Sequence, residues 1–418
     1  MINIPKGTKD VLPYDSYKWQ YVESQARKIA SLFNFHEIRT PIFEHTELFT
    51  RSIGNDTDVV QKEMYTFLDK GKRSITLKAE GTAPVARSYI ENALDACSLP
   101  LKMYYITPVF RYENPQAGRL REHHQFGVEA YGGDNALMDY EVISLAHAFL
   151  SSLGVKGLVL NLNSIGCEKC RENYNNALKE YLKERLGEMC PTCRERFERN
   201  TLRILDCKVD GCKEIVSGAP KIIDYICQDC SEHFEQLKSL LENGGIEYQV
   251  NPNIVRGLDY YTKTVFEFVT TQLGSQGTVC GGGRYNHLVE SVGGKATPCV
   301  GFGLGLERLL MLLEALGIEI KNNDRVEVFV LSQNVALVPK CMEIVKSLRS
   351  SGVSAETEYT GRSLKAQFRY ADKIKAKYAI VIGQSEIDNN EVVVKNLGDG
   401  NTQNVELDQI ANFVIGKR

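Results

Sequence analysis

Residues 102 to 131 read KMYYITPVFRYENPQAGRLREHHQFGVEAY. Two strand-like runs, at 102–106 and 125–131, flank a polar loop rich in Gly, Pro and Arg, which predicts a long β-hairpin with a charged tip. The runs 264–269 and 277–280 alternate in the same way. We therefore expect the central region of the chain to be an antiparallel sheet.

Charged and amide side chains of this hairpin lie at positions that favour one face of the sheet. Side chains alternate along a strand, so Arg111 and Glu113 can face the same side as Gln125 and Glu129. Such a surface would bind an anionic phosphate and an amine together, because arginine makes planar, bidentate contacts with phosphate. Taken alone, the segment is also explained by a solvated charged hairpin.

A glycine-rich segment, GFGLGLERLL at 301–310, leads into a strongly apolar helical pattern. The glycines follow a GxGxG pattern, no strand clearly precedes them, and no acidic residue stands where a dinucleotide ribose would need one, which argues against a Rossmann site. Glycine permits close approach of the backbone, and Arg308 at the start of the helix would suit a nucleotide phosphate. A simple helix cap is the alternative.

The length of 418 residues exceeds what one hydrophobic core usually supports, so two or three domains are expected. Residues 16–33 have helical spacing and precede an extended run at 37–43, in which Pro41 suits the edge or end of a strand. Strand-like runs in the last hundred residues alternate with helical stretches and predict a mixed or parallel α/β domain. The boundary is expected at the polar linker 321–324.

Composition places the chain among ordinary globular proteins. It has no apolar run near the roughly 18 residues that span a bilayer, and its N-terminus lacks the pattern of a secretory signal. We expect a cytoplasmic protein without a membrane span. The net charge of -3 offers no global attraction for nucleic acid, so RNA binding would have to come from local basic patches.

Three of these segments, in order, resemble the signature motifs of class II aminoacyl-tRNA synthetases: the helix and strand with Pro41, the 102–131 hairpin, and the 301–310 segment. The resemblance implies an α+β catalytic core with an antiparallel sheet, the class II synthetase fold, within residues 1–324. It also implies a homodimer formed through the first motif, and ATP bound in a bent form.

Three further peptides resemble those that distinguish the histidyl-tRNA synthetases within that class. They read KAEGTA at 78–83, VRGLDYY at 255–261 and GSQGTVCGGGRY at 274–285. The resemblance covers nearly the whole chain and weakens in the cysteine-rich region. It implies histidine–tRNA ligase activity, with L-histidine, ATP and tRNA(His) as partners and Mg²⁺ as the accompanying ion.

The resemblance also implies a role for each matching residue of a histidine pocket. Glu80 and Thr82, with Gln125, would hold the α-ammonium group, and Glu129 with Tyr261 would bond the imidazole nitrogens. A pocket that pairs both ring nitrogens rejects amino acids that leave its polar groups unpaired. The residues implied to contact histidine are Glu80, Gly81, Thr82, Arg111, Gln125, Glu129, Arg256, Tyr260 and Tyr261.

The remaining implied roles concern ATP. Arg111 would bridge the substrate carboxylate and the α-phosphate, Arg121 and Arg308 would bind the outer phosphates, and Glu113 the adenine or its neighbourhood. Arg256 would be a second catalytic cation at the α-phosphate. The reaction is attack of the histidine carboxylate on the α-phosphorus, followed by transfer to the tRNA 3′ end, and it needs positioning and charge stabilisation more than a protein nucleophile.

Residues 167–230 hold eight of the twelve cysteines among many charges on helical patterns, and we treat about 167–245 as a helical insertion. Three Cys-x-x-Cys pairs and one wider pair provide for one or two closed Cys₄ structural zinc sites. A set of reduced thiols is the alternative. The candidate ligands are Cys167, Cys170, Cys190, Cys193, Cys207, Cys212, Cys227 and Cys230.

The tail, residues 325–418, carries its own signal. Arg362, Lys365, Arg369 and Lys373 have spacings of three and four, so we expect them to share one helix face suited to RNA phosphates. A solvated helix face is the alternative. The segment resembles the anticodon-binding domain of the histidyl, threonyl, prolyl and glycyl enzymes, which favours tRNA binding.

The sequence leaves two rival functions to be weighed. One is the non-catalytic relative that regulates ATP phosphoribosyltransferase, which is built on the same core but lacks the C-terminal domain and degrades the motifs. The other is a class II synthetase for a different amino acid, against which the peptide around Tyr261 and Glu129 argue.

Overall fold

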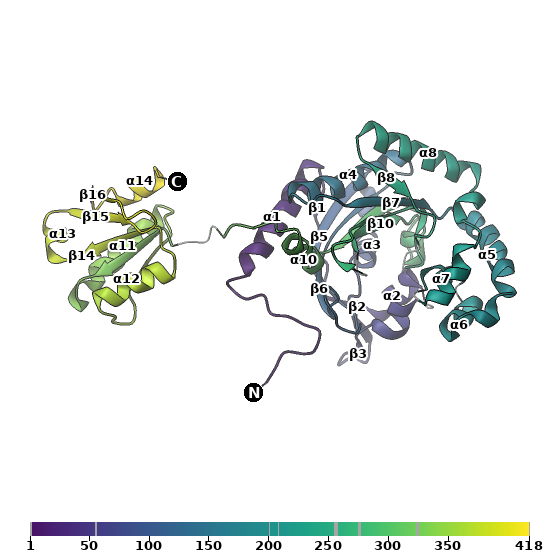
Figure 1. Cartoon of the computed structure of the whole chain (residues 1–418), viewed down its shortest axis with the longest axis horizontal. Coiled ribbons are helices and arrows are strands. Elements are labelled where there is room, and N and C mark those ends of the chain that lie inside the picture. The colour runs from purple at the N-terminus through teal and green to yellow at the C-terminus, as the bar shows by residue number, and fades with distance from the viewer. Residues whose placement is uncertain are drawn as a thin grey trace. The chain divides into compact units, whose positions relative to one another are not determined.

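The chain folds into two compact units, Met1–Ile320 and Lys321–Arg418. Figure 1 shows the larger unit in purple to green and the smaller one in yellow-green. The computed structural model describes residues 2–54, 57–199, 201–207, 209–254, 258–274, 277–322 and 326–417.

An eight-stranded sheet lies at the centre of the larger unit (Figure 1). Its strand order is β1-β5-β6-β11-β10-β9-β7-β8. Its strands are β1 (His36–Glu37), β5 (Leu101–Phe110), β6 (Glu122–Tyr131), β7 (Val159–Ser164), β8 (Tyr248–Val250), β9 (Thr262–Val269), β10 (Thr278–Arg284) and β11 (Cys299–Gly305). Neighbours are antiparallel except for the outer pairs β1–β5 and β7–β8, which are parallel. The predicted antiparallel core, including the hairpin, is confirmed.

Different helices of the larger unit cover the two faces of this sheet. Because side chains alternate along a strand, Tyr104 and Phe126 pack with α1, α4 and α10 in the main core, whereas Met103 and Tyr105 pack with α3 and α9. Glu129 lies directly opposite Met103 in the register, so it belongs to the α3 face. The helices are α1 (Ser16–Leu32), α2 (Thr46–Ile53), α3 (Thr82–Glu91), α4 (Ala136–Ser152), α9 (Leu288–Ser291) and α10 (Leu306–Ala315), with the short η1 (Val59–Glu63) and η2 (Leu94–Ala96).

A small antiparallel sheet with the order β2-β4-β3 lies before α3 in the chain. Its strands are β2 (Phe43–His45), β3 (Thr66–Leu68) and β4 (Ser74–Leu77). The single strand expected at 37–43 is therefore wrong. The chain makes β1 in the large sheet, passes through Pro41, which lacks the N–H that a continuous ladder requires, and enters β2 in the small sheet.

The insertion between β7 and β8 is helical, as predicted. Its core is a separate group of buried side chains that includes Tyr174, Leu178 and Ile204. At the end of the insertion, α8 packs against α4 in the main core. The elements are α5 (Glu168–Lys183), η3 (Leu186–Glu188), α6 (Pro191–Arg199), η4 (Thr201–Asp206), α7 (Asp210–Ser217), η5 (Ile222–Tyr225) and α8 (Gln228–Asn243).

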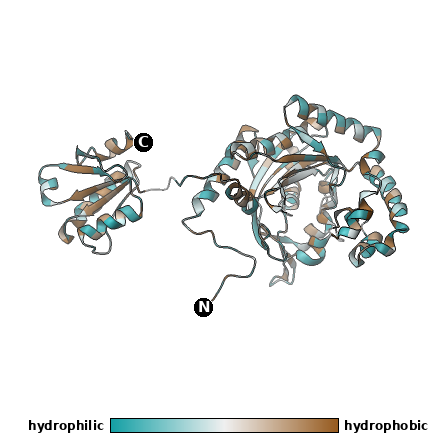
Figure 2. Cartoon of the chain, viewed as in Figure 1, coloured by the Kyte–Doolittle hydropathy of each residue, from teal (hydrophilic) through white to brown (hydrophobic). Residues whose placement is uncertain are grey.

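The smaller unit is a five-stranded mixed sheet with the order β13-β12-β14-β15-β16, as the alternating pattern predicts. Figure 2 shows hydrophobic residues concentrated along its strands. Helices α11 and α14 share one hydrophobic core with the sheet, and α12 packs in a second one. The elements are β12 (Val328–Ser332), η7 (Val335–Leu337), α11 (Val338–Ser350), β13 (Ala355–Thr357), α12 (Leu364–Lys373), β14 (Tyr378–Ile382), α13 (Gln384–Asp388), β15 (Glu391–Asn396), β16 (Thr402–Glu406) and α14 (Ile410–Ile415).

Among the described residues, no helix is both long and apolar enough to cross a membrane.

Candidate active site

Two adjoining cavities, of about 550 and 240 Å³, lie at the α3 face of the large sheet. Besides a wall that it shares with the smaller cavity, the larger cavity is lined by Glu80 and Thr82 at the start of α3 and by Tyr260 and Tyr261 before β9. The smaller cavity is also lined by Arg308 of α10. The wall that they share consists of Arg111, Glu113, Arg119, Gln125, Gly281 and Gly303.

The glycines of β11 make room for side chains of the neighbouring strand β6. A Cβ atom on Gly301 would overlap the Glu129 carboxylate, and one on Gly303 would overlap the Gln125 amide. The GxGxG segment is itself a strand, β11, and its Gly303 lines the larger cavity. The helix α10 begins only after it, and this places Arg308 in the first turn, as predicted.

The Glu80 carboxylate is fixed by the first turn of α3. Its two oxygens accept hydrogen bonds from the backbone N–H groups of Thr82 and Ala83, each at 2.7 Å. The Gly81 N–H donates to Gln125 Oε1 at 3.2 Å, which joins this turn to β6. Burial raises the pKa of Glu80. The turn thus presents a buried carboxyl and an amide at one side of the larger cavity.

Glu129 is held by two tyrosines and is only 1% exposed. The Tyr105 hydroxyl donates to its Oε1 at 3.1 Å, and the Tyr285 hydroxyl donates to its Oε2. Burial raises the pKa of Glu129 to about 8, against the hydrogen bonds that favour the ion. Close to neutral pH, the group is therefore a carboxyl that holds its proton and sits beside Thr82.

Two arginines of the β5–β6 loop belong to the shared wall, and a third, from α10, lines the smaller cavity beside it. Arg111 follows β5 directly, and its Nε donates to the Ala79 carbonyl at 2.8 Å. Arg119 Nε lies 2.7 Å from Glu113 Oε2, and Arg308 Nη1 donates to the Thr278 carbonyl at 2.7 Å. These contacts hold guanidinium groups in fixed positions, an arrangement suited to stabilising a polyanion without a covalent step.

Comparison with known proteins identifies the family. The sequence profile described as "Histidyl-tRNA synthetase" matches residues 7–309, and the one described as "Anticodon binding domain" matches residues 326–417. The histidine--tRNA ligase of Clostridium perfringens (strain SM101 / Type A) is 55% identical over 416 residues, which is 99% of each chain. This chain belongs to the histidyl-tRNA synthetase family.

Other members of the histidyl-tRNA synthetase family agree over nearly the full length. The Acetivibrio thermocellus histidine--tRNA ligase is 53% identical over 406 residues, 97% of each chain. The crystal structure of apo S. aureus histidyl-tRNA synthetase superposes with a TM-score of 0.85 at 39% identity, covering 99% of this chain and 100% of that one. The class II fold predicted from the motifs is thus confirmed.

Most of the residues that the histidyl-tRNA synthetase motifs imply line the two cavities, but of those that the structure describes, Gly81, Glu129 and Arg121 do not. Arg121 lines neither cavity: its Nε donates to the Glu113 carbonyl at 3.1 Å, and its guanidinium stacks on Tyr112 at 3.7 Å from the ring centre. Arg256 lies outside the described residues. Arg119, two residues before Arg121, lines both cavities instead, although the sequence motifs did not single it out.

Tyr105 and Tyr285 are the other site residues that sequence reasoning missed. Tyr105 lies inside the β5 strand pattern, where an aromatic residue predicts only core packing. Tyr285 ends the quoted GGGRY peptide, so that peptide was a usable signal.

His123 is one of the residues that line the smaller cavity, and burial lowers its pKa to about 3. His124 Nδ1 instead lies 3.0 Å from Glu307 Oε1.

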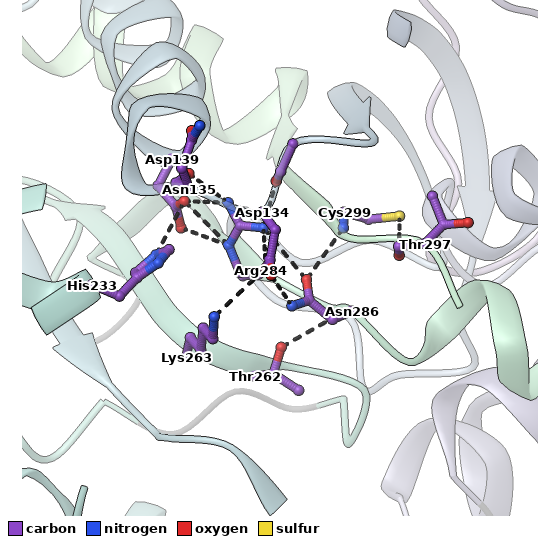
Figure 3. Close-up of polar contacts among 11 residues, drawn as sticks. Asp134, Asn135, Asp139, His233, Thr262, Lys263, Arg284, Asn286, Thr297 and Cys299 are labelled. Atoms are coloured by element: carbon purple, nitrogen blue, oxygen red, sulfur yellow. Dashed lines mark hydrogen bonds and ion pairs between the residues drawn. The ribbon is translucent and has the colours of Figure 1, made fainter. Parts of the chain in front are cut away.

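Arg284, in the GGGRY peptide at 281–285, belongs to a buried structural network (Figure 3). It bonds Asp139 of α4, both side chains being fully buried, and its Nη1 donates to the Gly133 carbonyl at 2.7 Å. His233 of α8 approaches Asp139 at 3.3 Å. Burial opposes ionisation of Asp139, but the Arg284 charge outweighs it and lowers the pKa to about 2. The network joins the sheet, α4 and the end of the insertion.

The eight insertion cysteines form two groups of four, in each of which the sulfur atoms lie within 4.8 Å of one another. The first cluster brings together the N-terminal ends of α5 and α8, and the second brings together α6, η4 and α7. The sequence alone left this pairing open. The first cluster is Cys167, Cys170, Cys227 and Cys230; the second cluster is Cys190, Cys193, Cys207 and Cys212.

In the smaller unit, three of the four predicted basic residues lie on α12. Lys365, Arg369 and Lys373 are exposed, four residues apart, and share one helix face. Arg362 does not, because it precedes the helix and its Nη1 lies 3.0 Å from Glu358 Oε2. The prediction of a single helix face for all four residues is thus wrong at Arg362.

Proposed function

We propose that this chain is an ATP-dependent histidine–tRNA ligase, which forms histidyl-adenylate and transfers the histidyl group to the 3′ end of tRNA(His). The observation that carries the proposal is the shared wall of the two cavities. Arg111 stands in that wall, so one guanidinium can contact an amino-acid carboxylate on one side and the ATP α-phosphate on the other. Holding the two reactants at one cation supplies both proximity and charge stabilisation.

The larger cavity is proposed to bind histidine. Glu80, Thr82 and Gln125, with the backbone of Gly81, would hold the α-ammonium group. Tyr260 and Tyr261 line the same cavity, which supports their proposed place around the side chain. Glu129, with its elevated pKa, would pair one imidazole nitrogen and Tyr261 the other.

The smaller cavity is proposed to bind ATP. Arg308 and Arg119 would contact the outer phosphates and Glu113 the adenine side, while Arg121 and Arg256 remain predictions from the family resemblance. Mg²⁺ would accompany the phosphates and offset their charge. Glu307 lines the cavity and offers the carboxylate oxygens that Mg²⁺ prefers.

The smaller unit, proposed as the anticodon-binding domain over 325–418, would bind tRNA. Its exposed row of Lys365, Arg369 and Lys373 supports this, since phosphate contacts by basic side chains dominate RNA affinity. The homodimer and the cytoplasmic location expected from the sequence remain proposals. We also propose structural zinc in the insertion, on the support of the two four-cysteine clusters.

The regulatory alternative receives less support. A solved structure titled as an ATP phosphoribosyltransferase regulatory subunit/histidyl-tRNA synthetase from Bacillus halodurans C shares the fold, with a TM-score of 0.63 at 22% identity. The present chain, however, has arginines at the shared wall and a segment that matches the anticodon-binding profile. Both features favour aminoacylation over regulation.

The test is ATP–pyrophosphate exchange with each of the twenty amino acids, followed by charging of tRNA(His). Exchange that depends on histidine alone is the expected result, and Arg111→Gln should abolish most of it. The exposed Arg349, which lies in the other unit, provides a matched control as Arg349→Gln and should leave exchange unchanged. Exchange driven by another amino acid, or by none, would refute the assignment.

A further inference from the structure

The two cysteine clusters have the dimensions of tetrahedral metal sites. Zinc–sulfur bonds of about 2.3 Å in a tetrahedron place the sulfurs about 3.8 Å apart. The Sγ–Sγ distances are 3.5 Å for Cys167–Cys170, 4.0 Å for Cys170–Cys230 and 3.9 Å for Cys190–Cys207. A disulfide would need about 2.05 Å. Both clusters therefore match four thiolates around one ion, not two disulfides.

The clusters occupy different places in the insertion. The first cluster joins its two ends, the starts of α5 and α8, so it fixes the insertion to the strands on either side. The second cluster lies in the middle, where α6, η4 and α7 are all short. Helices of that length are marginal alone, and a segment of about forty residues usually needs a metal or disulfides to fold. A metal there would determine where the middle segment lies.

That middle segment reaches the larger cavity. Cys190 and Cys207 line the cavity, together with Arg196 and Arg203, which stand three residues after Cys193 and four before Cys207. Both arginines meet Asp58 of the catalytic fold, Arg203 Nη2 at 2.7 Å and Arg196 Nη2 at 3.4 Å from Asp58 Oδ2.

Asp58 immediately precedes η1, whose last residue, Glu63, also lines the cavity. The Glu63 carbonyl accepts a hydrogen bond from the Tyr112 N–H at 2.7 Å, in the loop that follows Arg111. A chain of contacts thus runs from the second cluster through Arg203, Asp58 and η1 to the segment that carries Arg111. A shift of the middle segment would be transmitted to the substrate site.

We propose that a zinc ion in the second cluster positions Arg196 and Arg203 against Asp58 and thereby closes one wall of the larger cavity, so that full affinity for substrate depends on this metal. The zinc takes no part in the chemistry, and the two arginines are positioning residues. The inference rests on the proposed use of the larger cavity as the histidine site. The first cluster, by contrast, stabilises the attachment of the insertion.

The test compares paired cysteine variants of the full-length protein. The unmodified protein should contain two zinc ions per chain, and Cys207→Ser/Cys212→Ser and Cys227→Ser/Cys230→Ser one each. In ATP–pyrophosphate exchange, the KM for histidine should rise at least tenfold in the second-cluster variant, since small displacements of positioning groups have large effects. It should rise much less in the first-cluster variant. Cys97→Ser, at an exposed cysteine outside both clusters, should keep two zinc ions and a normal KM.

A second variant covers the case in which loss of the metal unfolds the insertion. Arg203→Gln should keep both zinc ions and raise the KM about three- to tenfold, the scale of one partly exposed ion pair with some coupling to the wall. Hydrogen–deuterium exchange without substrate should be faster over residues 57–63 in both the Arg203 and the second-cluster variants.

Several results would overturn the inference. One is a zinc content below one equivalent in the unmodified protein, and another is an equal KM effect of the two cysteine pairs. A third is an Arg203→Gln protein with normal KM and normal exchange at 57–63. Zinc content and hydrogen–deuterium exchange can be measured whichever amino acid is activated, so these two readouts test the inference separately from the proposed function. Absence of histidine-dependent exchange in the unmodified protein would instead refute the proposed function.

Discussion

Replacing Glu129 by Gln tests the proposed histidine pocket at a fully buried group. The change keeps the shape of the side chain but replaces one carboxyl oxygen by an NH₂ group, which cannot accept the hydrogen bond from Tyr105 or Tyr285 or from an imidazole N–H. A hydrogen bond to a charged partner contributes about 1.5–3 kcal/mol. The Kd for histidine should therefore rise about 10- to 150-fold.

The pH dependence gives a sharper test of the same group. Burial holds the pKa of Glu129 at about 8 in the empty pocket, and free imidazole has a pKa of about 6.5. Between about pH 6.5 and pH 8, Glu129 carries the one proton that it shares with the imidazole of the bound histidine. The affinity for histidine should therefore not change with pH in this range. Above about pH 8 that proton is lost, and below about pH 6.5 the free histidine carries a second one, so affinity should fall on both sides. Glu129→Gln should lack the decline on the alkaline side.

Isothermal titration calorimetry of histidine binding from pH 6 to 9 measures both effects, and the exposed Glu391→Gln serves as a control.

The folded-state pKa of Glu129 lies above its unfolded value of 4.5, so its contribution to stability is full below pH 4.5 and is lost as the pH rises through 8. Without histidine, the Gln variant should thus gain stability relative to the unmodified protein at pH 9. An affinity loss below threefold, or an unchanged alkaline decline in the variant, would refute this account of the pocket.

Three further predictions concern other parts of the chain. Arg256→His should slow histidine activation about a hundredfold or more with little change in histidine affinity, as measured in single-turnover experiments; a normal chemical step with poor binding would make it a pocket residue. Deleting residues 326–418 should leave pyrophosphate exchange largely intact and greatly weaken tRNA charging, and equal loss of both in a folded protein would contradict this division. Asp139→Asn should lower the free energy of unfolding by about 3–5 kcal/mol in urea titrations, because it leaves the Arg284 charge buried without its partner; a change below 1 kcal/mol would show that water or another group compensates.

Local sequence patterns were enough to predict much of the fold. The period-two alternation of the 102–131 hairpin and the helical spacing of 16–33 depend only on neighbouring residues, and both elements form as expected. The strand and helix alternation after residue 326 likewise produces the mixed α/β unit. The histidyl-tRNA synthetase motifs added the family, which the comparisons confirm.

Tertiary structure decided which residues meet across long stretches of chain. The spacing of the cysteines defines four pairs, but only the tertiary structure brings the start of α8 to the start of α5, so that Cys167 meets Cys227, and the end of η4 to the start of α6, so that Cys190 meets Cys207. The approach of Arg203 to Asp58 spans 145 residues and has no sequence signal. Contacts of this kind depend on strand order and on how the insertion packs.

The site shows the same limit over a shorter distance. Sequence pattern could not distinguish Arg119 from Arg121, because a loop of irregular backbone has no period that fixes the direction of its side chains. In the structure, the Gly118 loop turns Arg119 into both cavities, and Tyr112 stacks on Arg121 outside them. The sequence thus determined which kinds of group the site contains, whereas the packing of the loop against α10 decided which of the two arginines lines it, since side-chain direction in a loop is set by tertiary contacts rather than by local periodicity.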